Sequence, residues 1–109
     1  MGDRANIKVT GHGDVHLYTH WAGTELPKTL QDGLIRGRSR WDDPIYLARI
    51  LFCEMVKDDA DDITGYGISG KVGDGDNRVL TVDTENQIVK WSGRQATFEE
   101  YIGLDSPGW

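Results

Sequence analysis

Three arginines alternate along one short polar segment, which reads Arg-Gly-Arg-Ser-Arg-Trp-Asp-Asp from Arg36 onward. In an extended stretch the side chains of Arg36, Arg38 and Arg40 would point to one side, because alternate residues share a face. Guanidinium groups match the geometry of phosphates and carboxylates, and an indole ring can stack on a base. The segment therefore predicts a binding site for a small anionic, nucleotide-like ligand, with Trp41 or Trp21 as the stacking surface.

The same arginines have a second interpretation, because the chain is rich in acidic residues. It carries 18 Asp and Glu residues against 12 Lys and Arg, a formal net charge of -6. Ion pairs between exposed side chains are common and contribute little to stability. A solvated loop whose arginines pair with nearby carboxylates is therefore the alternative to a binding site.

A second group of polar residues, His16, Tyr18 and His20, falls on a predicted strand. Their spacing places the three side chains on one face, since successive side chains of a strand alternate between its two faces. A polar sheet face or a ligand pocket would use them, and we include all three among the predicted ligand-binding residues.

Tyr66 completes that set, and it lies in the segment Thr-Gly-Tyr-Gly-Ile-Ser. Gly65 and Gly67 leave the backbone of this segment bare, which marks a place where a helix or a flat ligand approaches closely. The segment is not a dinucleotide-binding motif, because a third glycine and a following helix are both missing.

Neither a metal ion nor a cofactor is predicted. His16 and His20 would lie about 13 Å apart along a strand, too far to share one metal ion. The single cysteine, Cys53, excludes an internal disulfide framework and a zinc site built from several cysteines. We interpret it as a small, packed and unreactive thiol, and no catalytic residue is predicted.

The length and composition indicate one globular domain over residues 1–109 and exclude several partners. Net negative charge argues against duplex nucleic acid, whose phosphates require a basic face. No apolar run approaches the ~20 residues of a membrane span. The first residues, Met-Gly-Asp-Arg-Ala-Asn, do not form a secretory signal, so a cytoplasmic location is expected.

The hydrophobic periodicity predicts eight elements in the order β-β-α-α-β-β-β-α. Hairpin connections imply antiparallel strands, so the predicted fold class is α+β, a single antiparallel sheet of about five strands with two helices on one face. Turns are expected at 11–14 and 73–77, where glycine can supply positive φ angles. The predicted strands span 6–10, 15–21, 63–69, 78–83 and 87–91, and the predicted helices span 25–36, 44–57 and a closing turn from 97.

Capping residues set the ends of these helices. Thr24 is the predicted cap of the first helix and Gly37 its left-handed end. Asp43 is expected to cap the second helix, and Thr97 with Glu100 to form a capping box at the third. The second helix is expected to bury four side chains against the sheet: Ala48, Leu51, Phe52 and Met55.

Five blocks of the sequence resemble a family of small uncharacterised proteins of bacteria and their phages. The blocks are Gly-Asp-Arg-Ala-Asn-Ile (2–7), Leu-Tyr-Thr-His-Trp (17–21), Arg-Trp-Asp-Asp-Pro-Ile-Tyr-Leu-Ala-Arg-Ile (40–50), Thr-Gly-Tyr-Gly-Ile-Ser (64–69) and Val-Asp-Thr-Glu-Asn-Gln-Ile-Val (82–89). This resemblance implies a setting in the cytoplasm of a bacterial host cell, and it assigns no catalytic residues.

Three functions are compatible with these features. The first is a non-catalytic protein that binds a small anionic, nucleotide-like ligand, as a phage protein that sequesters a host nucleotide signal would. The second is a small hydrolase or phosphodiesterase that uses a histidine with an acidic residue. The third is an acidic protein that inhibits a partner through its surface. Four tryptophans also make a homo-oligomer plausible, because tryptophan is enriched at interfaces.

Overall fold

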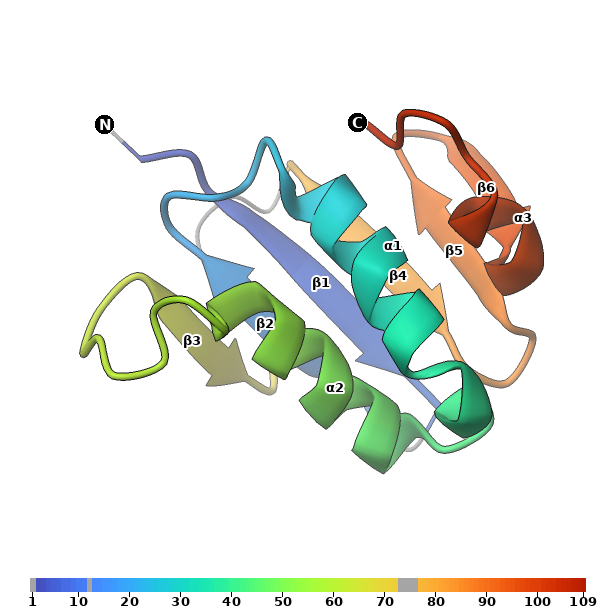
Figure 1. The fold of residues 1–109 in the computed structure, drawn as a ribbon, viewed down its shortest axis with the longest axis horizontal. Helices are drawn as coiled ribbons and strands as arrows, with labels where there is room; N and C mark the ends of the chain where they lie inside the picture. Colours follow the sequence, from blue (N-terminus) through green and yellow to red (C-terminus); the bar gives the residue numbers. More distant parts are fainter. Residues whose placement is uncertain (1, 12, 73–76) are drawn as a thin grey trace.

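The computed structural model describes residues 2–11, 13–72 and 77–109, and these form one six-stranded sheet with three α-helices on one of its faces (Figure 1). None of the helices in these ranges is long and apolar enough to cross a lipid bilayer. The elements are β1 (Ala5–Thr10), β2 (Val15–Thr19), α1 (Leu26–Arg36), the 3-10 helix η1 (Arg38–Arg40), α2 (Pro44–Val56), β3 (Tyr66–Ser69), β4 (Val79–Asp83), β5 (Ile88–Trp91), β6 (Arg94–Thr97) and α3 (Phe98–Ile102).

The sheet is mixed, and the prediction of a purely antiparallel sheet was wrong. The strand order is β3-β2-β1-β4-β5-β6. β1 and β4 run parallel, whereas the other neighbouring strands run antiparallel. The difference arises because β4 pairs with β1 rather than with β3, the strand that precedes it in the sequence. The predicted turns at 11–14 and 73–77 include His12 and residues 73–76, which lie outside the described residues.

A sixth strand, β6, was missed in the sequence. It pairs with β5 through a two-residue turn made by Ser92 and Gly93, with φ angles of 47° and 74°. Two consecutive residues with positive φ match the twist of a tight hairpin, and glycine tolerates this conformation without strain. The turn therefore adds one more antiparallel strand to the predicted five.

The core lies between the sheet and the helices. Alternate residues of the inner strands point toward the helices and are fully buried, because the side chains of a strand alternate between faces. In α2, Leu51 and Met55 are buried as predicted, together with Leu47, but Ala48 and Phe52 are only half-buried. The core side chains include Ile7, Leu17, Leu80, Val82 and Val89 from the sheet and Leu26, Leu30, Leu34, Phe98 and Tyr101 from the helices.

The helix ends confirm two of the predicted caps. The Tyr46 backbone N–H donates to the Asp43 side chain at 3.3 Å, and the capping box of Thr97 and Glu100 is complete. The cap predicted at Thr24 was wrong, since α1 begins after Glu25 without a side-chain cap. Gly37 follows α1 with a φ of -91°, so the predicted left-handed end was also wrong.

Asp3 connects the start of the chain to two residues that are distant in the sequence, Thr24 and Arg78. Its carboxylate accepts hydrogen bonds from Arg78 Nη1 at 2.8 Å and from the Thr24 backbone N–H at 2.9 Å and hydroxyl at 3.0 Å. The hydrogen bond from the Thr24 backbone, followed by that from Arg78, lowers the pKa of Asp3 below its usual 3.8. Thr24 therefore hydrogen-bonds to the Asp3 carboxylate and does not cap α1.

Replacing this carboxylate should produce a pH-dependent loss of stability. A lowered folded-state pKa contributes stability above the unfolded pKa, and this contribution is lost as the pH falls through the folded pKa. We expect Asp3→Asn to lower the free energy of unfolding at pH 7 by about 1 kcal/mol, since the site is partly exposed and screened. In urea titrations, the gap between variant and wild type should shrink below pH 3.8. A gap that is unchanged between pH 7 and the acid end would contradict this assignment.

Candidate functional site

The three arginines of the predicted site do not line up on one side of an extended segment. Arg38 and Arg40 lie in the 3-10 helix η1, directly after α1. Arg36 forms an ion pair with Glu54 at 3.3 Å, and Arg38 forms one with Glu99. In the described residues Arg40 has no carboxylate within 4.0 Å, and its guanidinium lies 4.8 Å from the centre of the Tyr46 ring. Two of the three charges are therefore already balanced by acids of the same chain.

The two candidate stacking tryptophans occupy different environments. Trp41 is only 8% exposed, its indole N–H donates to the Leu34 carbonyl at 2.9 Å, and its ring packs edge-on against Phe98. Trp21 is 56% exposed and lies against Gly65. The 11 residues of α1, a helix length of about 16 Å, lie between Trp21 and the η1 residues Arg38 and Arg40 along the chain. Thus the exposed indole is not the one beside the arginine segment.

His16, Tyr18 and His20 lie on or next to β2, as predicted, but only two of them touch. The Tyr18 hydroxyl is 2.9 Å from His20 Nδ1, which also accepts a hydrogen bond from Arg4 Nε at 3.2 Å. His16 is 7% exposed, and no partner for its Nδ1 is present in the described part of the chain. His20 is therefore held by the side chains of Tyr18 and Arg4, and neither of these contacts involves His16.

Tyr66 does not join these histidines. Its hydroxyl donates to Asp59 Oδ2 at 2.9 Å, in the loop after α2. Burial, followed by this hydrogen bond to Asp59, raises the pKa of Tyr66 to about 12. The bare backbone at Gly65 is explained by the ring of Trp21, because a Cβ on Gly65 would lie 2.4 Å from Trp21 Cζ3. The group that approaches this glycine is thus a side chain of the same chain.

A hollow beside β4, β5 and β6 is lined by two cationic side chains, Lys90 and Arg94. Its volume is about 500 Å³. The register pairs Thr81 with Lys90, and Lys90 with Gln95, so these three side chains form one row across the strands. They alternate with the buried Val82 and Val89 and therefore lie on the face away from the helices. The hollow is lined by Val79, Thr81, Lys90, Trp91, Ser92, Gly93, Arg94 and Gln95.

The charged groups of this hollow are both cationic. Lys90 and Arg94 line it, and no carboxylate is among the lining residues described. Lys90 has no ion-pair partner within 4.0 Å in the described ranges, and Arg94 Nη2 donates to the Trp109 carbonyl oxygen at 2.6 Å. The nearest acid along β4 is Asp83, whose pKa is lowered mainly by hydrogen bonds from Asn86 and Glu85 and also by the charge of Lys90. Lys90 therefore lies within electrostatic range of one carboxylate, which its own turn holds outside the lining of the hollow.

The sequence contains a partial signal for this row. Thr81 and Lys90 fall at the polar positions of two predicted strands, so their outward direction follows from the alternation. Gln95 and Arg94 could not be placed, because β6 was not predicted. Their proximity to Lys90 depends on the pairing of β5 with β6, which a single sequence does not specify.

A second hollow has the opposite charge. It lies between α1, the end of α2 and β3, has a volume of about 300 Å³, and is lined by five carboxylate residues, Glu25, Asp32, Glu54, Asp58 and Asp59. Glu54 is 3% exposed and pairs with both Arg36 and Lys57. These acids would repel an anionic ligand, so this hollow is not a candidate for one.

No metal centre is apparent in the part of the chain that the structure describes. There, no three His, Cys, Asp or Glu side chains gather as ligands of a metal ion would. In the comparisons with known proteins, no family model, curated protein or solved structure matched the chain. The functional argument therefore starts from the geometry of the hollow beside β4–β6.

Proposed function

We propose that this chain is a non-catalytic binding protein for a small anionic, nucleotide-like ligand, which it holds in the hollow beside β4, β5 and β6. The observation that carries the proposal is a lining with two cations and no described carboxylate, in a chain of net charge -6. The volume of about 500 Å³ falls within the ~300–1,000 Å³ typical of small-molecule sites.

The lining offers the donors that an anionic ligand requires. Lys90 supplies a point charge and Arg94 a planar guanidinium, which suits phosphate or carboxylate oxygens. The hydroxyls of Thr81 and Ser92 and the amide of Gln95 can each donate a further hydrogen bond. The lining residues include no histidine, cysteine or acid among those described, and this supports binding over hydrolysis because acid–base catalysis uses such groups.

The charge distribution favours small anions over long polyanions. A local cationic patch on an acidic protein attracts a small anion at short range. A long nucleic acid would also be repelled by the net negative charge of the chain, and two cations neutralise few of its phosphates. This selectivity suits the sequestration of a host nucleotide signal by a phage or bacterial protein in the cytoplasm, which is the role we propose.

Removal of the lysine charge tests the site. We expect Lys90→Ala to weaken binding of the tightest ligand in a panel of cyclic and linear nucleotides about ten- to a hundredfold, since a charge-assisted hydrogen bond contributes roughly 1.5–3 kcal/mol. The measurement is calorimetric titration at fixed salt, with inorganic phosphate as a further probe. Lys28→Ala is the matched control, because this exposed lysine of α1 pairs with Asp32 outside the hollow.

The arginine segment is tested in the same titrations. Arg40→Ala removes the arginine of that segment that has no carboxylate partner in the described residues. Binding that is lost in Arg40→Ala and retained in Lys90→Ala would place the ligand at η1 and contradict the site proposed here. If no member of the panel binds the wild type, the nucleotide-like ligand class itself is wrong.

A further inference from the structure

A row of polar side chains crosses the sheet on the face away from the helices, and it contains two lysines. Lys8 of β1 is the register partner of Thr81 of β4, and Thr81 is in turn the partner of Lys90 of β5. Lys8 alternates with Ile7 and Val9 of the core, so its side chain points away from the helices. Neighbouring strands lie about 4.8 Å apart. Thr81 therefore has a lysine on the strand at each side of it.

The carboxylates nearest to this row along the strands lie to one side of it. Asp83 is two residues beyond Thr81 on β4, and Asp14 directly precedes β2, next to the end of β1. The hollow beside β4–β6 extends in the other direction, since its lining includes Val79 and Thr81 but not Asp83. A ligand in the hollow therefore approaches the two lysines from the side on which the described lining has no carboxylate.

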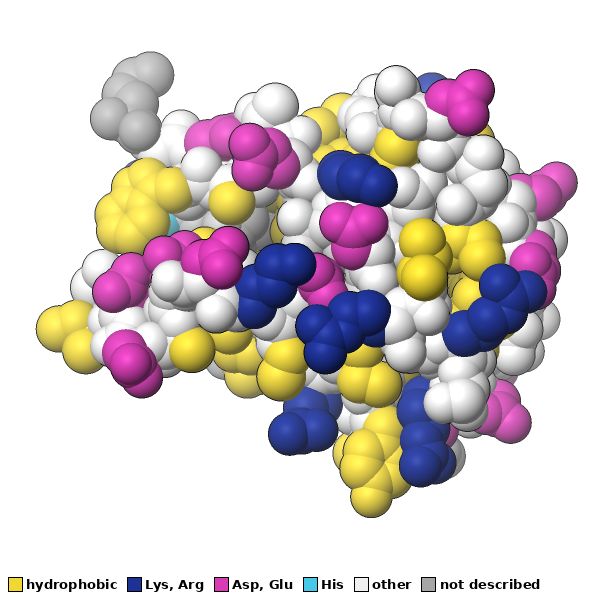
Figure 2. All heavy atoms as spheres, in the orientation of Figure 1, with side chains coloured by type: hydrophobic (Ala, Val, Ile, Leu, Met, Phe, Trp, Pro, Cys, Tyr) yellow, Lys and Arg dark blue, Asp and Glu magenta, His cyan; other side chains and the backbone are white. Residues whose placement is uncertain are grey.

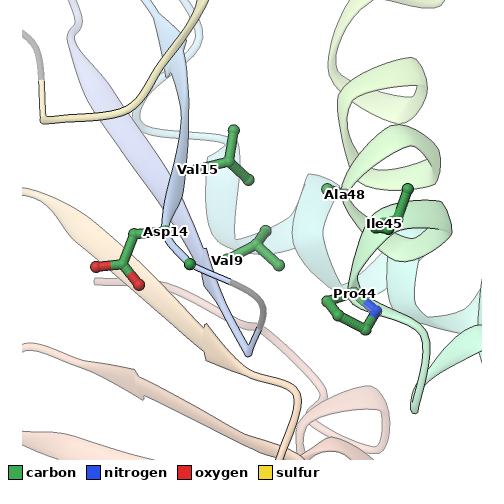
Figure 3. Close-up of a pocket in the computed structure, with 7 residues that line it drawn as sticks. Val9, Asp14, Val15, Pro44, Ile45 and Ala48 are labelled. Carbon is green, nitrogen blue, oxygen red and sulfur yellow. The ribbon is translucent and has the colours of Figure 1, made fainter.

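Asp14 holds Lys8 only weakly. The Lys8 Nζ lies 3.6 Å from Asp14 Oδ2, longer than a hydrogen bond, and the two side chains are 34% and 48% exposed. Exposed pairs of this kind contribute little. Figure 3 shows that the Asp14 carboxylate points away from the apolar side chains between the β1–β2 hairpin and α2. Because a flexible four-carbon stem carries its ammonium group, Lys8 can turn from Asp14 to an anion over Thr81.

The lysines on the helix side of the molecule are paired more closely. Figure 2 views this side and shows basic and acidic side chains next to each other over α1 and α2. Lys28 lies 3.1 Å from Asp32, and Lys57 lies 2.7 Å from Glu54. Lys90, by contrast, has no carboxylate within 4.0 Å in the described ranges. The row on the other face thus has more positive charge available to a ligand.

Two ammonium groups around one hydroxyl suit a doubly charged phosphate. A terminal phosphate monoester carries about two negative charges at pH 7. The phosphodiester of a cyclic nucleotide carries a single one. We infer that Lys8 is a further ligand-binding residue, and that a terminal phosphate lies over Thr81 between Lys8 and Lys90. The site then prefers nucleotides with a terminal phosphate to cyclic ones, an inference that rests on the function proposed above.

Nucleotides that differ only in the form of their phosphate test this preference. The probes are AMP and GMP, each compared with its cyclic form in calorimetric titrations at fixed salt. The wild type should bind the linear form of at least one of them about tenfold more tightly than its cyclic form. Lys8→Ala should weaken binding of that linear nucleotide by about tenfold or more and reduce the preference, since a charge-assisted contact is lost. Lys28→Ala is again the matched control.

Asp14→Asn should have the opposite effect. Without this carboxylate Lys8 has no competing partner, so the linear nucleotide should bind about two- to fivefold more tightly. In the double variant with Lys8→Ala, the gain from Asp14→Asn should largely disappear, because the two residues are coupled. A merely structural ion pair would instead make both single variants weaken binding. Circular dichroism of each variant establishes that the fold is retained.

The outcomes separate Lys8 from the site that it is inferred to extend. If Lys90→Ala loses binding while Lys8→Ala keeps both the affinity and the preference, the hollow holds its ligand without Lys8 and the inference is wrong. Equal affinity of the wild type for linear and cyclic forms overturns it as well. If none of the four probes binds, the inference fails, whereas the proposed function fails only if the rest of the nucleotide panel does not bind either.

Discussion

We expect Phe98→Ala to lower the free energy of unfolding by about 3–5 kcal/mol, the range found for large-to-small changes at fully buried aromatic residues. Phe98 is 0% exposed, and its ring meets Trp41 edge-on at a centroid distance of 5.3 Å. Its position is fixed from both sides, by the capping box that starts α3 and by the hydrogen bond from Trp41 to Leu34. The surroundings therefore have little freedom to collapse into the cavity that alanine would leave.

Phe52→Ala is the matched comparison, because it removes the same atoms from a half-buried site on the flank of α2. If Phe52 were fully buried, as the sequence predicted, its replacement by alanine would cost about 3–5 kcal/mol. With part of the ring in contact with solvent, we expect about 1–2 kcal/mol. Urea titrations of both variants at one pH measure the difference. Equal losses would contradict the placement of Phe98 in the core and of Phe52 at the partly exposed flank of α2.

Local signals in the sequence predicted much of the fold. The hairpin of β1 and β2 has the predicted pairing across residues 11–14, and α1 and α2 lie within a residue of their predicted bounds. Asp43 and Thr97 cap helices as expected, because an N-cap depends on residues only three positions away. These features are encoded within a few neighbouring residues, so a single sequence contains them.

The position of β4 could not be predicted in the same way. Its pairing with β1 joins residues about seventy positions apart, and a hairpin with β3 satisfied the same alternation of apolar and polar residues. A strand buried on one face can be placed beside several partners without changing its pattern. The parallel contact between β1 and β4 is therefore a property of the tertiary structure.

The candidate site shows the same difference between features set by neighbouring residues and features set by long-range pairing. The arginine segment is contiguous and was easily seen, but Arg36 and Arg38 meet Glu54 and Glu99 from distant elements. The row of Thr81, Lys90 and Gln95 comes from three strands and exists only once β4, β5 and β6 have paired. Folding thus partly neutralised charges that are contiguous in the sequence, and it brought together polar side chains that are far apart in the sequence.

The second large effect is expected at Gly65, where the backbone and a neighbouring ring both exclude a side chain. Gly65 has a φ of +97°, a conformation that L-residues rarely adopt. A Cβ would also lie 2.4 Å from Trp21 Cζ3 and 2.7 Å from Cε3, well inside contact distance. We expect Gly65→Ala to lower the free energy of unfolding by about 1–3 kcal/mol, the usual cost of a residue in a sparsely populated backbone region.

A double variant separates the two causes of this loss. Trp21→Ala removes the ring, so in the double variant the loss caused by Gly65→Ala should shrink to the backbone contribution alone. Gly70→Ala is the control, because no heavy atom lies within 4 Å of its Cβ position and no positive φ opposes alanine there. It should leave the urea midpoint nearly unchanged or raise it slightly, since alanine restricts the unfolded chain more than glycine. If Gly65→Ala behaves like Gly70→Ala, Trp21 does not pack against this glycine, and the bare backbone at Gly65 is again available to a ligand.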